Sequence, residues 1–318
     1  MCIRDRHLGV RGPAAQPDAL RIIAEEAELL GFTHLGLSDH IVIANKVNSP
    51  YPYTKTGKWF AEDNGECLEQ LTTLSFIAAA TSHLRLLTSV MVLPHRPPIL
   101  TAKMLNTIDV LSKGRLTVGL GVGWMEEEIA LLNGPDFKKR GAAANEYIEA
   151  FKILWTDGTP IYNGNQVKFS DIKFFPKPAQ TPHPPLWVGG EARLARERAG
   201  RLGDGWYPVG NNPKALFDTP ELYANGLKDV HEMAISNNRN PAEIACGIYI
   251  IWYNLGQTQH NSLGNRRSFT GSAQDILRDI SAYEKIGLQH LVIGGESDNL
   301  EACLQRMRVF NKEIMHYV

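Results

Sequence analysis

The stretch "LGLSDHIVI", residues 35–43, places an acid and an imidazole side by side where an apolar run breaks off. Asp39 can carry a negative charge, and His40 can give or take a proton near neutral pH. The pair therefore predicts a site of proton transfer, with His40 as the candidate catalytic residue. The structural alternative is that Asp39 caps the next turn and His40 is an ordinary loop histidine.

Small residues end three further apolar runs. They are Thr88 and Ser89 in "LLTSVMVLP", Gly119, Gly121 and Gly123 in "GLGVGW", and Gly189 and Gly190 in "WVGGEARLA". A glycine pair that leads into a helix leaves backbone N–H groups free, which predicts an anion site. Tight turns that need positive φ are the alternative. The run "GLGVG" does not complete a dinucleotide fingerprint, because Trp124 stands where the third glycine is needed.

These positions require a frame that brings strand ends together. Helical periodicity and short apolar runs alternate along the chain, and together with a damaged first strand they make eight strand and helix pairs. The expected helices cover 17–30, 66–83, 97–114, 144–158, 192–203, 220–237, 272–287 and 299–314, with strands at 33–39, 84–94, 115–124, 184–190, 205–210, 244–253 and 290–295. Eight such units predict an α/β fold of the (β/α)8 TIM-barrel type, and an open doubly wound sheet is the competing architecture.

A barrel explains why a strand ends in Asp39 and His40, because active sites of such barrels lie at the C-terminal ends of the strands. Two segments fall outside the alternation and are expected as insertions at that face: the loop 45–65 and the hairpin-like 160–180. The loop carries Tyr51, Tyr53, Trp59 and Phe60. We expect it to form a lid over an apolar or aromatic substrate, and a locally packed surface loop is the alternative.

The first residues do not resemble a buried strand, since Arg4, Asp5 and Arg6 interrupt it. Residues 1–6 are therefore expected to be non-native, with a truncated or corrupted first strand and a single barrel domain over 7–318. Burying these charges without partners would be costly, so we expect them to lie outside the fold.

Composition narrows the class further. The chain has 318 residues, 43% hydrophobic and 21% charged, and a formal net charge of -1, which favours a globular protein that binds neither nucleic acid nor membrane. The four cysteines are widely spaced, which argues against a zinc site and against a disulfide framework. No metal, a cytoplasmic location, a small-molecule substrate and a homodimer are the corresponding expectations.

Several stretches resemble the bacterial luciferase-like family of flavin and deazaflavin oxidoreductases, and most closely its branch that uses coenzyme F420. They are "LGLSDHIVI", "TSVMVLPHRPPILTAKMLNTIDVLSKGRLTVGLGVGWMEEEI", "KRGAAANEYIEAFKILW" and "HPPLWVGGEARLARERAGRLGDGWYP", which together cover most of 35–208. The W-V-G-G and G-D-G-W pieces are the most specific. Beyond 208 the likeness lies in the rhythm of helices and strands.

The resemblance implies a ring-shaped cofactor in the barrel mouth, either F420 or FMN. His40 would face the reacting side of the ring, and Ser89–Val90 would carry a non-prolyl cis peptide behind it. The implied cofactor-binding residues are Asp39, Thr88, Ser89, Val90, Gly121, Gly123, Trp124, Gly189, Gly190, Glu191 and Ala192, the last four holding the phosphate through backbone N–H groups. The expected substrate residues are Tyr53 and Trp59 of the loop 45–65, together with Trp206.

The implied activity is hydride transfer between F420 and a small organic substrate. One departure stands out: where the branch that oxidises a sugar phosphate has an acid after the glycine run, this chain has Trp124, and Glu126, Glu127 and Glu128 come later. A sugar phosphate substrate is therefore not expected. An FMN-dependent monooxygenase and a cofactor-binding barrel without turnover are the alternatives.

Overall fold

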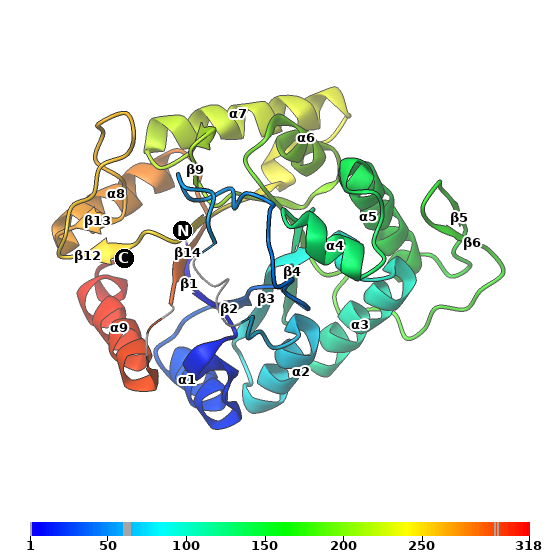
Figure 1. Ribbon diagram of the computed structural model, residues 1–318, viewed down its shortest axis with the longest axis horizontal. Coiled ribbons are helices and arrows are strands. Elements are labelled where there is room, and N and C mark those ends of the chain that lie inside the picture. Colours follow the sequence, from blue (N-terminus) through cyan, green and yellow to red (C-terminus); the bar gives the residue numbers. More distant parts are fainter. Residues whose placement is uncertain (1, 60–64, 296, 298) are drawn as a thin grey trace.

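The computed structural model describes residues 2–59, 65–295, 297 and 299–318. Within them, eight parallel strands close into a barrel in the order β1-β14-β11-β8-β7-β4-β3-β2, and helices surround it (Figure 1). The barrel strands are β1 Cys2–Leu8, β2 His34–Leu37, β3 Arg85–Val92, β4 Leu116–Gly121, β7 Leu186–Gly189, β8 Gly205–Tyr207, β11 Ala245–Ile250 and β14 His290–Gly294. The predicted (β/α)8 TIM barrel is thus confirmed, and the open sheet is excluded.

The helices follow the strands in the expected alternation. They are α1 Pro17–Leu29, α2 Gln70–Ala80, α3 Pro98–Leu111, α4 Glu126–Leu131, α5 Arg140–Thr156, α6 Arg193–Leu202, α7 Pro220–Ser236, α8 Ala273–Lys285 and α9 Leu300–Glu313. Of these, the short α4 was not expected from the sequence. None of the helices in the described residues is both long and apolar enough to cross a membrane.

Local sequence accounts for these boundaries. Helix α1 begins at Pro17, which suits the first helical position, and buries Leu20, Ile23 and Ala27 on one face. It stops before Gly31, whose φ is +78°. Helix α8 begins with a capping box in which Ser272 and Asp275 satisfy each other's backbone N–H groups. Short-range signals of this kind set where each barrel unit starts and ends.

Three pairs of short strands in the described residues lie outside the barrel. The predicted hairpin is present as β5 Tyr162–Asn163 paired antiparallel with β6 Lys168–Phe169. Two more small pairs follow the later strands: β9 Asn211–Asn212 with β10 Ala215–Leu216, and β12 Asn254–Leu255 with β13 Thr270–Gly271. These segments lengthen the loops around the barrel.

The first strand contradicts the expectation for residues 4–6. β1 pairs with both β14 and β2 and so closes the barrel. Arg4 is exposed, but Asp5 and Arg6 are fully buried. Arg6 is buried near α9, where burial lowers its pKa to about 10, and its Nη2 donates to the Gly295 carbonyl at 3.3 Å. The expectation that these charges lie outside the fold is therefore wrong for Asp5 and Arg6 and confirmed for Arg4.

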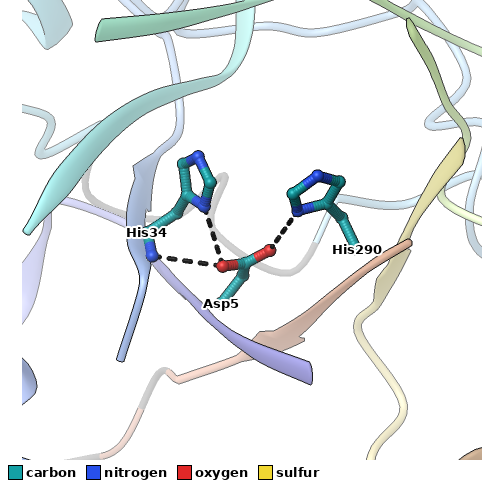
Figure 2. A group of neighbouring side chains, drawn as sticks. All are labelled: Asp5, His34 and His290. Atoms are coloured by element: carbon teal, nitrogen blue, oxygen red, sulfur yellow. Dashed lines mark hydrogen bonds and ion pairs between the residues drawn. The ribbon is translucent and has the colours of Figure 1, made fainter. Parts of the chain in front are cut away.

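Asp5 is buried because its charge has partners. Figure 2 shows its carboxylate between two rings that come from neighbouring strand starts, His34 and His290. The Nδ1 atoms of His34 and His290 lie 2.8 Å and 3.2 Å from the two Asp5 oxygens. Burial favours the neutral acid, but the two imidazoles lower the pKa of Asp5 to about 2. We call Asp5, His34 and His290 the base cluster, because they lie at the base of the barrel, the end opposite its mouth.

The donor atoms of the base cluster lie within 4.8 Å of one another, a spacing that a metal ion could bridge. The hydrogen bonds assign another role. The Nε2 of His34 accepts from Arg85 Nε at 3.3 Å, so the proton of a neutral His34 ring sits on Nδ1 and is donated to Asp5. With that nitrogen protonated, His34 contacts Asp5 through a hydrogen bond and has the Arg85 guanidinium at its other nitrogen.

Candidate active site

A cavity of about 980 Å³ opens at the C-terminal ends of the barrel strands. This is the upper end of the range for small-molecule sites, which leaves room for a tricyclic ring with a small substrate beside it. Predicted residues that line it are Asp39, His40, Tyr53, Trp59, Ser89, Val90, Gly121, Gly123, Trp124, Gly189, Gly190, Glu191 and Ala192. The structure therefore brings most of the sequence-predicted site together.

Glycines in the barrel wall make room for a bulge of β3. The register of β3 against β4 shifts between Thr88 and Met91, and the Ser89–Val90 peptide is cis, as the resemblance implied. A Cβ on Gly121 would lie 2.6 Å from Val90 Cγ2, and one on Gly119 would lie 2.1 Å from the Thr88 carbonyl oxygen. These glycines are therefore needed for space on the cavity side.

His40 is held by a buried carboxylate. Its Nδ1 lies 2.8 Å from Glu128 Oε2, on the first turn of α4. The Glu128 side chain has no exposed surface, whereas His40 keeps 12% exposure. The His40 ring packs against Trp59 at 4.5 Å between ring centroids, and Trp124 lies 6.4 Å away. The His40 imidazole thus faces an aromatic wall.

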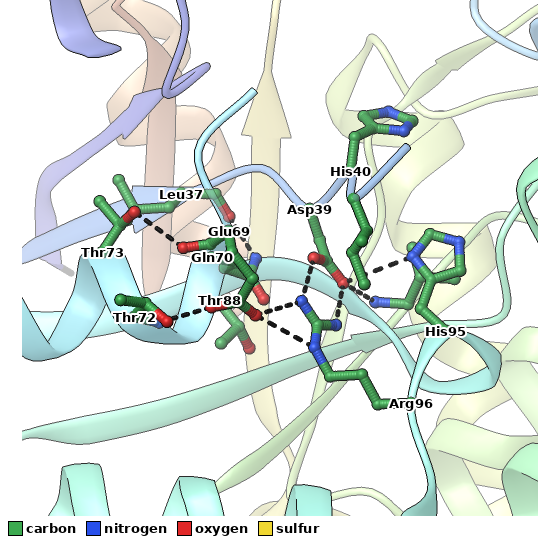
Figure 3. A network of polar contacts seen from close by, with 12 residues as sticks. Leu37, Asp39, His40, Glu69, Gln70, Thr72, Thr73, Thr88, His95 and Arg96 are labelled. Carbon is green, nitrogen blue, oxygen red and sulfur yellow. Dashed lines mark hydrogen bonds and ion pairs between the residues drawn. The ribbon is translucent and has the colours of Figure 1, made fainter. Parts of the chain in front are cut away.

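Asp39 points to the other side of the chain, where its carboxylate meets Arg96 (Figure 3). The Arg96 Nη1 and Nη2 atoms donate to its two oxygens at 2.8 Å and 2.7 Å, and the Val92 N–H donates at 2.8 Å. Burial opposes ionisation, but Arg96 and His95 leave the pKa of Asp39 lowered. Because these bonds occupy the carboxylate, Asp39 fixes the ends of β2 and β3 and does not present its charge to the cavity.

His95 lies between the two acids of the mouth. Its Nδ1 is 3.8 Å from Asp39 Oδ2 and its Nε2 is 3.7 Å from Glu128 Oε2, and burial lowers its pKa. We call Asp39, His40, His95, Arg96 and Glu128 the mouth network. Glu128, His95 and Arg96 were not predicted as site residues, although all three lie within the stretches quoted for the resemblance.

The loop that follows β2 contributes to the cavity wall. Glu127 Oε1 accepts from the backbone N–H groups of Asn48 and Ser49 at 2.7 Å and 3.2 Å, which fastens the loop to α4. The aromatic rings of this loop continue the aromatic wall, and the ring centroid of Tyr51 lies 5.1 Å from that of Trp124. Phe60, named with this loop in the sequence analysis, lies outside the described residues.

Two predicted residues do not reach the cavity. Trp206 is fully buried on the outer side of β8, stacked on Tyr223 of α7 at 5.2 Å between centroids. Side chains alternate along a strand, so the neighbouring Tyr207 faces the cavity instead and shares a 2.9 Å hydrogen bond with Ser89. Thr88 is also buried away from the cavity, and its hydroxyl donates to the Gly119 carbonyl at 2.7 Å. We therefore do not assign Trp206 to the substrate or Thr88 to the cofactor.

The opposite wall holds polar residues that the sequence analysis missed. His7 and Tyr249 share a 2.8 Å hydrogen bond between Nδ1 and the phenol oxygen. Burial, with Arg11 nearby, lowers the pKa of His7 to about 3, so this ring is neutral at physiological pH. The interrupted pattern of the first strand gave no reason to place His7 in the mouth.

Gly189 and Gly190 lead into α6, as the anion-site prediction requires, and Gly190 has φ +105°. The Glu191 carboxyl follows this glycine pair and accepts from the Val209 N–H at 2.7 Å. Burial raises the pKa of Glu191, which favours its neutral form.

A cavity at the C-terminal mouth of a barrel, lined by an imidazole, small residues and aromatic rings, lies where barrel enzymes have their active sites. The model of the luciferase-like monooxygenase family matches residues 1–254, and the chain belongs to that family.

Among curated relatives, the chain is 31% identical over 173 residues to an FMNH2-dependent dimethylsulfone monooxygenase of Pseudomonas putida. The match covers 54% of this chain and 47% of that protein, so it spans about half the relative's length. Among solved structures, the coenzyme F420-dependent tetrahydromethanopterin reductase of Methanopyrus kandleri superposes with a TM-score of 0.75 at 15% identity, covering 99% of each chain. A monooxygenase of Streptomyces bottropensis gives 0.73 at 20% identity, again covering 99% of each chain. The two structures show the same fold, and proteins named for F420 and for FMNH2 both occur among the neighbours.

Proposed function

We propose that this luciferase-like enzyme is a coenzyme F420-dependent oxidoreductase that transfers a hydride between the deazaflavin and a small apolar or aromatic substrate. The observation that carries the proposal is His40, an imidazole on the cavity wall whose inner nitrogen is bound to a buried carboxylate. Converting an alcohol carbon to a carbonyl releases a proton as well as a hydride, so such a site needs a proton acceptor. The F420-dependent structural neighbour supports this choice of cofactor.

The residues present fit such a group. When bound, the deazaflavin would supply or accept the hydride. Val90, with the space that Gly121 leaves for it, would back the ring, and Gly123 would flank it. The turn 189–192 before α6 would hold the phosphate through backbone N–H groups.

The aromatic wall supports the proposed substrate class. Trp59 is 6.0 Å from Trp124 between centroids, and both rings lie beside His40. An apolar or aromatic substrate would displace water there and gain contact with these rings. Tyr53, half-buried and with its pKa raised chiefly by desolvation, would stay neutral and complete the wall.

A titration of the enzyme with oxidised F420 and with FMN, followed by fluorescence, tests the cofactor. We expect F420 to bind at least about tenfold more tightly, a difference of about 1.4 kcal/mol. Equal affinities, or a preference for FMN, would contradict the proposal.

The similarity to the FMNH2-dependent monooxygenase favours a second candidate, an FMN-dependent monooxygenase on the same barrel. A deazaflavin does not activate oxygen in this way. Oxygen uptake with reduced FMN that depends on the enzyme, above the spontaneous oxidation of free reduced FMN, would therefore support this second candidate, and no increase over that background would support the first.

A further inference from the structure

Glu128 lies on the first turn of α4 and contacts the segment that follows β2. One of its oxygens, Oε1, accepts from the backbone N–H groups of Ile41 and Val42 at 2.7 Å and 3.2 Å. The other, Oε2, lies 2.8 Å from His40 Nδ1. The carboxylate therefore binds both the ring of His40 and the backbone that follows it.

The charge of Glu128 determines which nitrogen of His40 carries the proton. Burial favours the neutral acid, but the hydrogen bond from His40 and the charges of His40 and His95 leave the pKa of Glu128 below its ordinary value. An ionised carboxylate can only accept, so the Nδ1 of His40 must donate. In the neutral ring the proton then sits on Nδ1, and Nε2 is left as an acceptor.

The surroundings leave Nε2 available to the cavity. No hydrogen bond to it is found in the described part of the chain, and it is not among the fully enclosed polar atoms that lack a partner. His95 does not compete for Glu128 through a hydrogen bond, because its Nε2 lies 3.7 Å away, beyond a normal hydrogen-bond distance.

We propose that Glu128 is a positioning residue that fixes His40 as the Nδ1–H tautomer with Nε2 directed at the substrate. This inference rests on the proposed function. In the oxidising direction the substrate O–H bond would break and its proton would move to His40 Nε2, and a bound oxidised deazaflavin would supply the two-electron acceptor for the hydride that leaves the carbon. The imidazolium formed is stabilised through Nδ1 by Glu128, and the reducing direction reverses each transfer.

If Glu128 had a purely structural role and only held the backbone after β2, its replacement by glutamine would leave the tautomer of His40 unchanged. In Glu128→Gln the side-chain oxygen can still accept from Ile41, but the amide can only donate toward His40 Nδ1. A donor at that position stabilises the opposite tautomer, with the proton on Nε2. The tautomer therefore separates a positioning role from a structural one.

The experiment is ¹⁵N NMR of histidine-labelled enzyme without cofactor, at a pH where the His40 ring is neutral, with His40→Asn to assign the signal. We expect the Nδ1–H tautomer in the native chain and the Nε2–H tautomer in Glu128→Gln. Glu28→Gln is the matched control, because Glu28 also accepts from backbone N–H groups, those of Ser82 and Leu84 among them, and lies far from the mouth. It should leave the His40 signal unchanged.

Turnover provides the second readout. Glu128→Gln should lower kcat on the order of 10²-fold and change the cofactor Kd less than about twofold. Glu28→Gln should leave both kcat and Kd unchanged. An Nε2–H tautomer in the native chain would overturn the inference even if the variant fails to fold, and so would an unchanged tautomer or kcat in a folded Glu128→Gln. If the tautomers behave as expected and the native chain shows no F420-dependent turnover, the proposed function fails and the tautomer assignment stands.

Discussion

The base cluster and the mouth network are built from the same kinds of side chain. At each end of the barrel a fully buried carboxylate lies between imidazole rings, Asp5 between His34 and His290, and Glu128 between His40 and His95. At the base, the outer nitrogen of His34 already accepts from Arg85. At the mouth, His40 borders a cavity of about 980 Å³. Access to a ligand, and not residue type, therefore distinguishes the site that can do chemistry from the one that stabilises the fold.

The largest expected effect is a difference in turnover rate between variants of His40 and of His34. His40→Asn keeps much of the size and some hydrogen bonding, but it removes the group that exchanges a proton, so kcat should fall by roughly 10²–10⁴ with little change in cofactor Kd. His34→Asn should destabilise the fold and leave the rate of the folded enzyme unchanged. Single-turnover measurements give the rates of the two folded variants. A near-native rate for His40→Asn would show that His40 is an ordinary loop histidine.

The next effect concerns the Asp39–Arg96 ion pair of the mouth network, which has no counterpart in the base cluster. Asp39→Ala leaves the buried Arg96 with Glu69 as its remaining acidic partner, whose oxygen accepts from Arg96 Nε at 3.1 Å. We expect the free energy of unfolding to drop by about 3–5 kcal/mol, and cofactor binding to weaken more than the rate of the bound complex. Urea unfolding and cofactor titration give the two numbers. A loss of less than about 1 kcal/mol would show that the pair does not hold the ends of β2 and β3.

A smaller effect is expected at the base, with a defined pH dependence. The pKa of Asp5 is lowered from 3.8 to about 2 in the folded chain, so its ionised form stabilises the fold above pH 4, and this contribution is lost as the pH falls toward 2. Asp5→Asn should therefore cost about 2 kcal/mol at neutral pH, and the difference from the native chain should shrink below pH 4. Urea unfolding at a series of pH values measures it. A difference independent of pH would mean that Asp5 is not ionised in the fold.

The sequence predicts the repeating units well because their signals are local. Apolar spacing, prolines and glycines near Pro17 and Gly31 mark helix ends within a few residues, and strand ends such as Asp39 and His40 could be placed at the mouth by topology. Side-chain alternation would also have separated Tyr207 from Trp206, since adjacent strand residues face opposite sides.

The partnerships that stabilise the buried acids could not be predicted in the same way. Glu128 reaches His40 from 88 positions away, on a six-residue helix too short to show a period. Asp5 meets His290 across 285 positions. A charge in a strand looks costly when its partners are distant in sequence, which is why the first strand was misjudged.

The most direct test of the account is a titration of histidine-labelled enzyme with oxidised F420, in which the ring signals of His40, His34 and His290 are followed by NMR. The account predicts that the His40 signal shifts and saturates with the same Kd as the fluorescence titration, while the two signals from the base cluster stay in place. An unchanged His40 signal at saturating F420, or equal shifts in His34 and His290, would contradict it.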